Sequence, residues 1–313
     1  MVDFRYLLIT VVAIFLALTV GIALGAGFLG EPLREGLEHS VDSVRRDNNK
    51  LTDQVAQLRD DIGERQTFAE RLEPVVTDNV LAGRPFVLLS FDGTDGKVTD
   101  SIRRGLEESG ANLVTTVSFS DKLALASRPE RDQIATIVES ISDQPDKLRD
   151  EVAGRIGQLS SSVAGSDLQQ TNESVARRLD DLLGQLQDAG YAAIESVEDA
   201  TVPGGAGFLI AGGATEQPPF PAAPFAERLG IALTNGGATT MVLESTDSVW
   251  GMVSMVRDSG EANSEVSTVD QIETVQGRIA MVLGLSCPSA DGAGHFGVGA
   301  DATELLPEAC TGG

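Results

Sequence analysis

The feature that most constrains this chain is an apolar run close to its N-terminus. No charged residue occurs from Tyr6 to Gly30, and most of the run consists of Leu, Ile, Val, Ala and Phe. About 20 such residues in a helix span a bilayer. A cleaved signal peptide is the alternative, but its apolar core would run for only about 7–15 residues after a basic start. We therefore predict an uncleaved single-pass transmembrane anchor over residues 1–30.

Only five residues precede this run, so the simplest topology leaves them in the cytoplasm and exports the rest. We expect an anchor in the cytoplasmic membrane and an extracytoplasmic C-terminal domain. Within the anchor, small residues recur every four positions, at Ala13, Ala17, Gly21 and Gly25. Gly21 and Gly25 form a GxxxG pair, which lets two helix backbones approach closely. This stripe predicts that the anchor packs against a second copy of itself.

A heptad pattern follows the anchor and predicts a parallel dimeric coiled coil over residues 31–75. Apolar residues alternate in steps of three and four over about five heptads, as a left-handed coiled coil requires. The d positions hold Leu37, Val44, Leu51, Leu58 and Leu72, and the a positions hold Val41, Asn48, Val55, Ile62 and Ala69. Leu at d with Val or Ile at a favours two parallel strands, because these shapes pack best in that geometry.

Two polar residues interrupt the apolar heptad positions. Asn48 at an a position costs stability, but it can pair with its twin and so set the register and the parallel orientation. Arg65 at a d position is expected to weaken or splay the coil near its distal end. The alternative is an amphipathic helix packed on the chain's own domain, although such helices usually carry a broader apolar stripe.

The remaining residues show a pattern of alternating strands and helices. Phe86–Phe91 is predicted to be a buried strand, a helix follows with Val98, Ile102 and Leu106 on one face, and Leu113–Val117 is the next strand. Further strands are predicted over 191–197, 207–211, 240–243 and 266–269, and further helices over 225–233, 249–256 and 271–285. Such βαβ units build parallel sheets. Residues 76–285 are therefore predicted to form an α/β, Rossmann-like domain with a mostly parallel sheet.

Three other segments complete the predicted organisation. Lys122 to Gln187 shows polar, helical spacing, which predicts a helical insertion in the α/β domain. Pro74 and the break at Leu81–Pro85 are expected to end the coiled region. Residues 286–313 are predicted to form a glycine-rich C-terminal tail. Its cysteines, Cys287 and Cys310, would pair as a disulfide in an exported protein and would be incidental thiols in a cytosolic one.

The charge excludes some classes of ligand. Lys and Arg total 23 against 47 Asp and Glu, a formal net charge of −24. A surface of this sign repels nucleic acid and anionic lipid headgroups, so we expect neither as a direct ligand of the domain.

Candidate sites are few. The loop Asp92–Gly96 follows the first strand, where open α/β sheets bind ligands, but Ser90 stands where a haloacid dehalogenase needs its nucleophilic aspartate. A solvated turn is therefore the expectation there. The glycine-rich segments 204–207 and 212–213 flank a strand instead of opening a helix after one, which predicts turns and not a dinucleotide cradle.

The residues needed for catalysis or for soft-metal binding are scattered. The chain has two histidines, His39 in the heptad segment and His295 in the tail, so a catalytic triad is hard to build. Met252 and Met255, beside Trp250, are predicted to be core residues and not copper ligands. We expect no enzymatic activity and no resident cofactor.

Two stretches resemble a known family. They are the anchor segment from Ala13 to Gly25 and the segment from Ser267 through Thr274 to Leu285, which contains Gly277 and Arg278. With the intervening coil, they resemble the actinobacterial family of mycobacterial copper transport protein B (MctB) and its relative SteB. The resemblance implies copper homeostasis or copper efflux, with copper as a possible ligand. For SteB-like members it implies a dimeric scaffold that partners a second membrane protein to control peptidoglycan hydrolysis at cell division. It supplies no catalytic or metal-binding motif.

Overall fold

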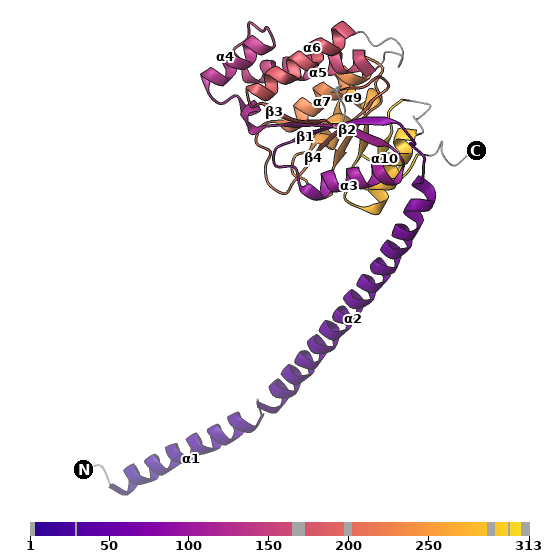
Figure 1. The fold of residues 1–313 in the computed structure, drawn as a ribbon. Coiled ribbons are helices and arrows are strands. Elements are labelled where there is room, and N and C mark those ends of the chain that lie inside the picture. Colours follow the sequence, from indigo (N-terminus) through magenta and orange to yellow (C-terminus); the bar gives the residue numbers. More distant parts are fainter. Residues whose placement is uncertain are drawn as a thin grey trace. The chain divides into compact units, whose positions relative to one another are not determined.

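The computed structural model describes residues 4–28, 30–164, 173–196, 202–286, 292–299 and 301–307. The chain divides into two compact units, Met1–Thr67 and Phe68–Gly313. The first unit is helical, and the second contains an α/β sheet (Figure 1).

Two long helices form the N-terminal part. Helix α1 spans Phe4–Phe28, and its segment Arg5–Leu24 is long and apolar enough to cross a membrane. This confirms the predicted N-terminal apolar helix. Helix α2 spans Gly30–Thr77 without interruption and contains Pro74. Pro74 and the break at Leu81–Pro85 were predicted to end the coiled region, and α2 ends between them, at Thr77. The carbonyl of Pro74 still accepts a hydrogen bond from the N–H of Asp78 at 3.1 Å, so the helix closes one turn later.

The second unit contains a seven-stranded sheet with the order β3-β2-β1-β4-β5-β6-β7. Its strands are β1 Pro85–Phe91, β2 Asn112–Phe119, β3 Ala192–Ser196, β4 Gly207–Gly212, β5 Thr240–Glu244, β6 Ser267–Val269 and β7 His295–Phe296. Only the β2–β3 pair is antiparallel. This confirms the mostly parallel α/β sheet. Strand β7 lies within the segment predicted as a tail.

Helices cover both faces of the sheet (Figure 1). Helices α3 Gly96–Glu108 and α10 Val275–Ser286 pack on one face, over a core that includes Ile102, Leu106 and Met281. The other face is covered mainly by α5 Pro145–Ala164 and α7 Ala222–Thr234. These two helices approach so closely that a Cβ added at Gly157 would overlap Ala232.

The predicted helical insertion is confirmed. It contains the short 3-10 helix η1 Asp121–Ala124 and helices α4 Arg128–Ile137, α5 and α6 Glu173–Asp188. Between β5 and β6 lie two shorter helices, α8 Met252–Asp258 and α9 Ala262–Glu265.

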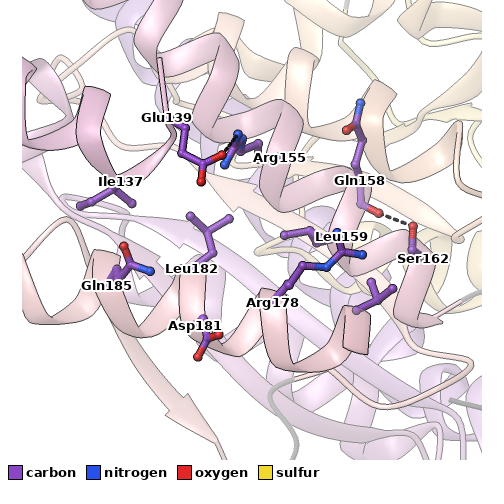
Figure 2. Close-up of a pocket in the computed structure, with 11 residues that line it drawn as sticks. Ile137, Glu139, Arg155, Gln158, Leu159, Ser162, Arg178, Asp181, Leu182 and Gln185 are labelled. Atoms are coloured by element: carbon purple, nitrogen blue, oxygen red, sulfur yellow. Dashed lines mark hydrogen bonds and ion pairs between the residues drawn. The ribbon is translucent and has the colours of Figure 1, made fainter. Parts of the chain in front are cut away.

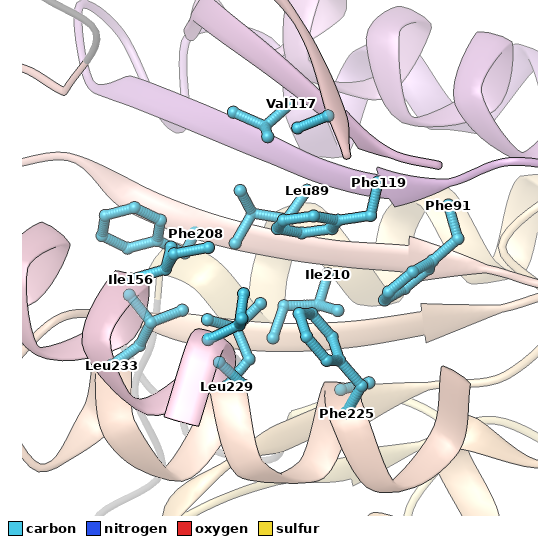
Figure 3. Packing of buried hydrophobic residues seen from close by; sticks show 14 of the residues in the cluster. Leu89, Phe91, Val117, Phe119, Ile156, Phe208, Ile210, Phe225, Leu229 and Leu233 are labelled. Atoms are coloured by element: carbon cyan, nitrogen blue, oxygen red, sulfur yellow. The ribbon is translucent and has the colours of Figure 1, made fainter. Parts of the chain in front are cut away.

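An aromatic cluster fills the larger core beside α7 (Figure 3). The ring centroid of Phe91 lies 5.8 Å from that of Phe119 and 6.0 Å from that of Phe225. Tilted and edge-to-face pairs at such distances add to the stabilisation that burial provides. The cluster lies under the carboxyl ends of β1 and β2, so it supports the sheet edge where a ligand site is expected.

Candidate functional site

Open α/β sheets bind ligands at the carboxyl ends of their parallel strands, at the point where the strand order reverses. In this sheet the order reverses between β1 and β4. Trp250 occupies this position. A Cβ added at Gly212, at the end of β4, would lie 3.0 Å from its ring, and one added at Gly93, in the β1–α3 loop, would lie 3.7 Å away. The indole Nε1 donates to the carbonyl of Glu216 at 2.8 Å. The chain's own tryptophan therefore fills the space that a nucleotide takes in a Rossmann fold.

The loop Asp92–Gly96 has structural partners. The Asp95 carboxylate accepts from the N–H of Lys97 at 3.0 Å and caps helix α3. Asp92 accepts from the N–H of Asp121 at 3.2 Å. The N–H of Asp95 donates to the carbonyl of Gly213 at 3.0 Å, and Gly213 has a φ of 116°, as a turn glycine allows. These contacts agree with the predicted βα turn.

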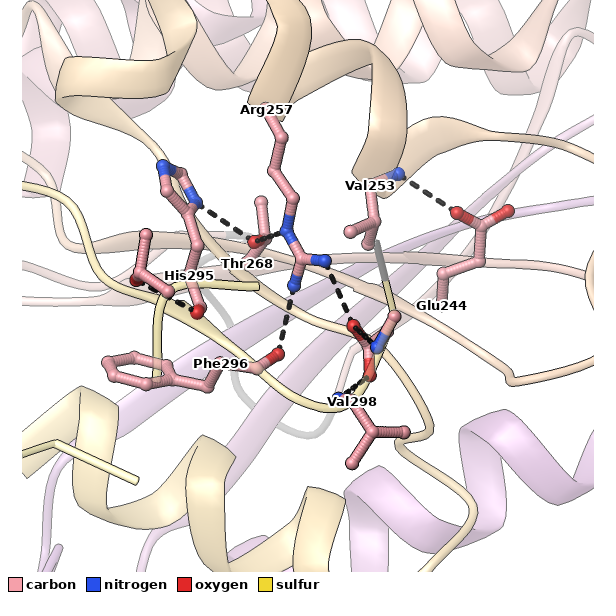
Figure 4. Close-up of polar contacts among 10 residues, drawn as sticks. Glu244, Val253, Arg257, Thr268, His295, Phe296 and Val298 are labelled. Carbon is pink, nitrogen blue, oxygen red and sulfur yellow. Dashed lines mark hydrogen bonds and ion pairs between the residues drawn. The ribbon is translucent and has the colours of Figure 1, made fainter. Parts of the chain in front are cut away.

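A second carboxylate, Glu244 at the end of β5, is also engaged (Figure 4). It accepts from the N–H groups of Gly251 and Val253, both at 2.9 Å, and from the hydroxyl of Ser248. These groups lie at the N-terminus of α8, where a negative charge is stabilising. Glu244 is therefore a helix cap.

Arg257 is the centre of a buried polar network (Figure 4). Its guanidinium donates to the hydroxyl of Thr268, the carboxylate of Asp270 and the carbonyl of Phe296, each at 2.9 Å. Asp270 also accepts from the N–H of Val298 at 2.9 Å. One arginine thus joins α8, β6 and β7, and it explains why the short strand β7 adds to the sheet.

His295 completes this network. Its Nε2 lies 2.9 Å from the carbonyl oxygen of Asn263, and its Nδ1 lies 3.0 Å from the hydroxyl of Thr268. A carbonyl only accepts, so Nε2 carries the proton and Nδ1 accepts from Thr268. Burial lowers the pKa of His295, and the neighbouring charge of Arg257 lowers it further. The histidine is a neutral structural group, a role that sequence reasoning missed.

The third polar feature joins the end of α2 to α10. The Glu73 carboxylate accepts from Nε and Nη2 of Arg278, both at 2.6 Å, and their side chains are 5% and 6% exposed. Burial raises the pKa of the nearby Glu108, and the negative charge of Glu73 raises it further. This pair holds the last turns of α2 against the domain.

The segment that carried the family resemblance forms the turn between β6 and α10. Gln271 has a φ of 56°, and its carbonyl accepts from the N–H of Thr274 at 2.9 Å. A Cβ added at Gly277 would overlap that carbonyl oxygen. The Glu273 carboxylate accepts from the N–H of Thr246 at 3.1 Å. The motif therefore builds a junction between β5, β6 and α10.

A groove of about 480 Å³ lies among α4, α5 and α6 (Figure 2). Its lining combines apolar side chains, such as Leu182, with both signs of charge. Arg155 pairs with Glu139 at 2.8 Å, and Arg178 and Asp181 lie on α6. The balanced charge selects no particular class of ligand.

Metal ligands are dispersed. Within the described residues, no group of three or more His, Cys, Asp or Glu side chains could hold a metal ion. Met252 is fully buried, as predicted, but Met255 is 36% exposed, so its assignment to the core is wrong. Cys287 and Cys310 lie outside the described residues, and their disulfide stays a prediction.

The residues proposed for self-association lie on α1 and α2. On α2, large apolar heptad side chains are exposed, with values from 38% for Leu72 through 45% for Val41 to 66% for Val44. The exposed set also contains Leu51, Val55, Leu58 and Ile62, and the side chain of Leu37 is outside the described part. The structure of one chain does not test their pairing.

Comparison with known proteins identifies the family. The family model described as "Copper transport outer membrane protein, MctB" matches residues 1–307. Proteins named copper transporter MctB from Mycobacterium tuberculosis and Mycobacterium bovis are 24% identical over 306 residues, covering 96% of this chain and 97% of theirs. The protein of that name from Mycobacterium leprae is 25% identical over 316 residues, covering 97% and 99%. These matches confirm the resemblance and give the SteB-like alternative no support. The chain belongs to the MctB family of copper transport proteins.

Proposed function

We propose that this chain is a membrane-anchored, extracytoplasmic envelope protein of copper homeostasis. In this proposal it acts as a non-enzymatic dimer with a second membrane protein. The observation that carries the copper assignment is the family match, which covers residues 1–307 and so includes the anchor, the long helix and the α/β domain.

The properties of α1 support the anchor. None of the segment Arg5–Leu24 is buried. The hydroxyls of Thr10 and Thr19 donate to carbonyl oxygens one turn earlier, at 2.8 and 2.6 Å, so these polar groups are satisfied within the helix. An alkaline phosphatase fused after Gly313 tests the orientation. We expect the phosphatase to be active. Activity of a fused reporter that works only in the cytoplasm would show the opposite topology.

The positions of the methionines support indirect handling of copper. Cu(I) prefers clusters of thiolates and thioethers. Met241, Met252 and Met281 are at most 1% exposed and are packed in the two hydrophobic cores. A single membrane helix encloses no channel, which favours action with a second membrane protein that conducts the ion.

The dimer is supported by the heptad pattern on α2. Leu51 and Leu58 are 60% and 59% exposed in the single chain, and side chains of this size are usually covered in the native assembly. With Val55 and Ile62 they form the seam that a parallel coil requires.

Cellular copper content tests this function. Deleting the gene in its host should raise the copper content of cells grown with added copper, and the full chain should restore it. A variant with Leu51→Asn and Leu58→Asn should fail to restore it at equal abundance. The control changes exposed polar residues of the same helix, Asp53→Asn and Asp60→Asn. An unchanged copper content after deletion would contradict the copper assignment, and full rescue by the leucine variant would contradict the dimer.

A further inference from the structure

The last turns of α2 present two different faces. One face is turned toward the chain's own domain, where Glu73 and Thr77 are 4% and 1% exposed and Glu73 pairs with Arg278. The other face carries large apolar side chains in the open. Phe68 is 68% exposed and Val75 is 75% exposed.

These exposures disagree with an uninterrupted heptad. A regular continuation from Ile62 would place Ala69 and Val76 at the next a positions, but both are partly buried within the folded unit. The exposed apolar residues are Phe68, Leu72 and Val75, in steps of four and three. Leu72 is also a d position of the regular heptad, but Phe68 and Val75 are not core positions of it.

The apolar heptad positions that end at Ile62 form a first stripe, and Phe68, Leu72 and Val75 form a second. Six residues separate Ile62 from Phe68, and Arg65 lies halfway between them. From Ile62 the positions 65, 68, 72 and 75 follow in steps of three, three, four and three. A regular heptad alternates steps of three and four, so the second step of three corresponds to an insertion of three residues into the repeat. Such an insertion locally overwinds a coiled coil and turns its seam around the helix. Because α2 is continuous through this region, the same helix carries both stripes.

We propose that the dimer seam changes phase at Arg65 and continues along Phe68, Leu72 and Val75, packed against the same residues of a second copy. The inference rests on the proposed parallel dimer and specifies its interface. The buried Glu73–Arg278 pair holds each domain on a different face of its own helix, which leaves this stripe free for the twin helix.

Charge at the phase change favours a second copy as the occupant. Glu64 and Arg65 are adjacent and exposed, and within the described part of the chain neither is found in an ion pair. In the shifted phase Glu64 takes a g position and Arg65 an a position, which are neighbours across a parallel dimer. Each chain therefore offers an acid and a base to its twin, so Arg65 finds a partner there.

Cysteine crosslinking of the full chain in membranes tests the phase. Single cysteines are placed in a variant that lacks Cys287 and Cys310, and Ile62→Cys serves as the reference on the undisputed part of the seam. We expect Phe68→Cys and Val75→Cys to form dimers at a rate close to that of the reference. Ala69→Cys and Val76→Cys should react at least about tenfold more slowly, because thiol–disulfide reaction depends on access.

The crosslinking pattern tests the phase change and the dimer separately. Rapid crosslinking at 69 and 76 with none at 68 and 75 would show a dimer with an uninterrupted heptad and would overturn the phase change alone. No crosslinking at any position, Ile62→Cys included, would overturn the dimer together with it. Capture of a different protein by Phe68→Cys would overturn the choice of occupant.

A second measurement avoids new thiols. Phe68→Ser with Val75→Ser should weaken dimerisation of the detergent-solubilised chain at least about tenfold in sedimentation equilibrium. The control Thr67→Ala, at an exposed position outside the stripe, should leave it unchanged. Equal dimerisation affinity of the two variants would refute the proposal that Phe68 and Val75 lie in the dimer seam.

Discussion

Breaking the buried pair between Glu73 and Arg278 should destabilise the α/β domain strongly. Replacing Arg278 with Met keeps most of the side-chain volume but removes two hydrogen bonds of 2.6 Å. It leaves the Glu73 carboxylate buried and without its charge partner. Glu108, whose pKa burial and the charge of Glu73 already raise, then faces Glu73 without the compensating arginine.

The expected cost follows from the burial of both partners. Removing one member of a buried pair costs about 3–5 kcal/mol, because an uncompensated charge stays out of water. A domain of this size loses about 2–4 °C in Tm per kcal/mol, so Arg278→Met should lower Tm by about 6–20 °C. Glu73→Gln should cost less, since Arg278 keeps a hydrogen-bonding neighbour and the nearby Glu108. The double variant Glu73→Leu with Arg278→Met should recover most of the loss, because an apolar pair suits a buried site.

Trp250 is the only tryptophan in the chain and is 6% exposed, so its fluorescence reports unfolding of the domain. The control is Arg103→Met, which removes an exposed pair of 3.8 Å with Asp100 on α3 and should cost at most about 1 kcal/mol. Equal shifts for Arg278→Met and the control would refute the claim that the buried pair holds the end of α2 to the domain.

Three further results are expected. Burial is the main reason that the pKa of His295 lies below 6.5. The unfolded chain therefore binds more protons than the folded chain at acidic pH. The stability that His295 contributes is complete above pH 6.5 and falls on acidification. The difference in unfolding free energy between the native chain and His295→Gln should therefore shrink below that pH, and a constant difference would contradict it. Gly277→Ala should cost about 1–3 kcal/mol through overlap with the Gln271 carbonyl, whereas Gly184→Ala, with open space around it, should be neutral or stabilising; equal effects in denaturant titrations would refute the packing argument. Asn48→Ile should raise the thermal stability of the coil and loosen the choice between two and three strands, and a lower stability by circular dichroism would argue against Asn48 at the seam.

Local periodicity predicted most of the fold. The buried run Phe86–Phe91 and the spacing of Val98, Ile102 and Leu106 identified β1, α3 and the βαβ unit, because each pattern reflects one element facing one core. The two-residue strand β7 has no periodicity of its own. It depends on Arg257, which lies 39 residues from Phe296 in the chain.

The polar junctions were beyond sequence reasoning for the same reason. Glu73 and Arg278 are 205 residues apart, and no local pattern links them. Pro74, which lacks an N–H, and the break at Leu81–Pro85 were expected to end the coiled region. Helix α2 continues past Pro74 and ends at Thr77, before that break. Trp250 had no predicted role of its own, and only the fold shows that it fills the nucleotide position.

Direct binding of Cu(I) to the purified full-length chain tests most sharply whether copper is handled by an assembly or by this chain itself. The measurement is competition with a Cu(I) chelator, with the chain in detergent under anaerobic conditions. Because the described methionines are mainly core residues, we expect no stoichiometric binding at submicromolar affinity. One tightly bound Cu(I) per chain, lost on changing Met252 and Met255 to Leu or the two cysteines to Ser, would contradict indirect handling and make this protein a direct carrier.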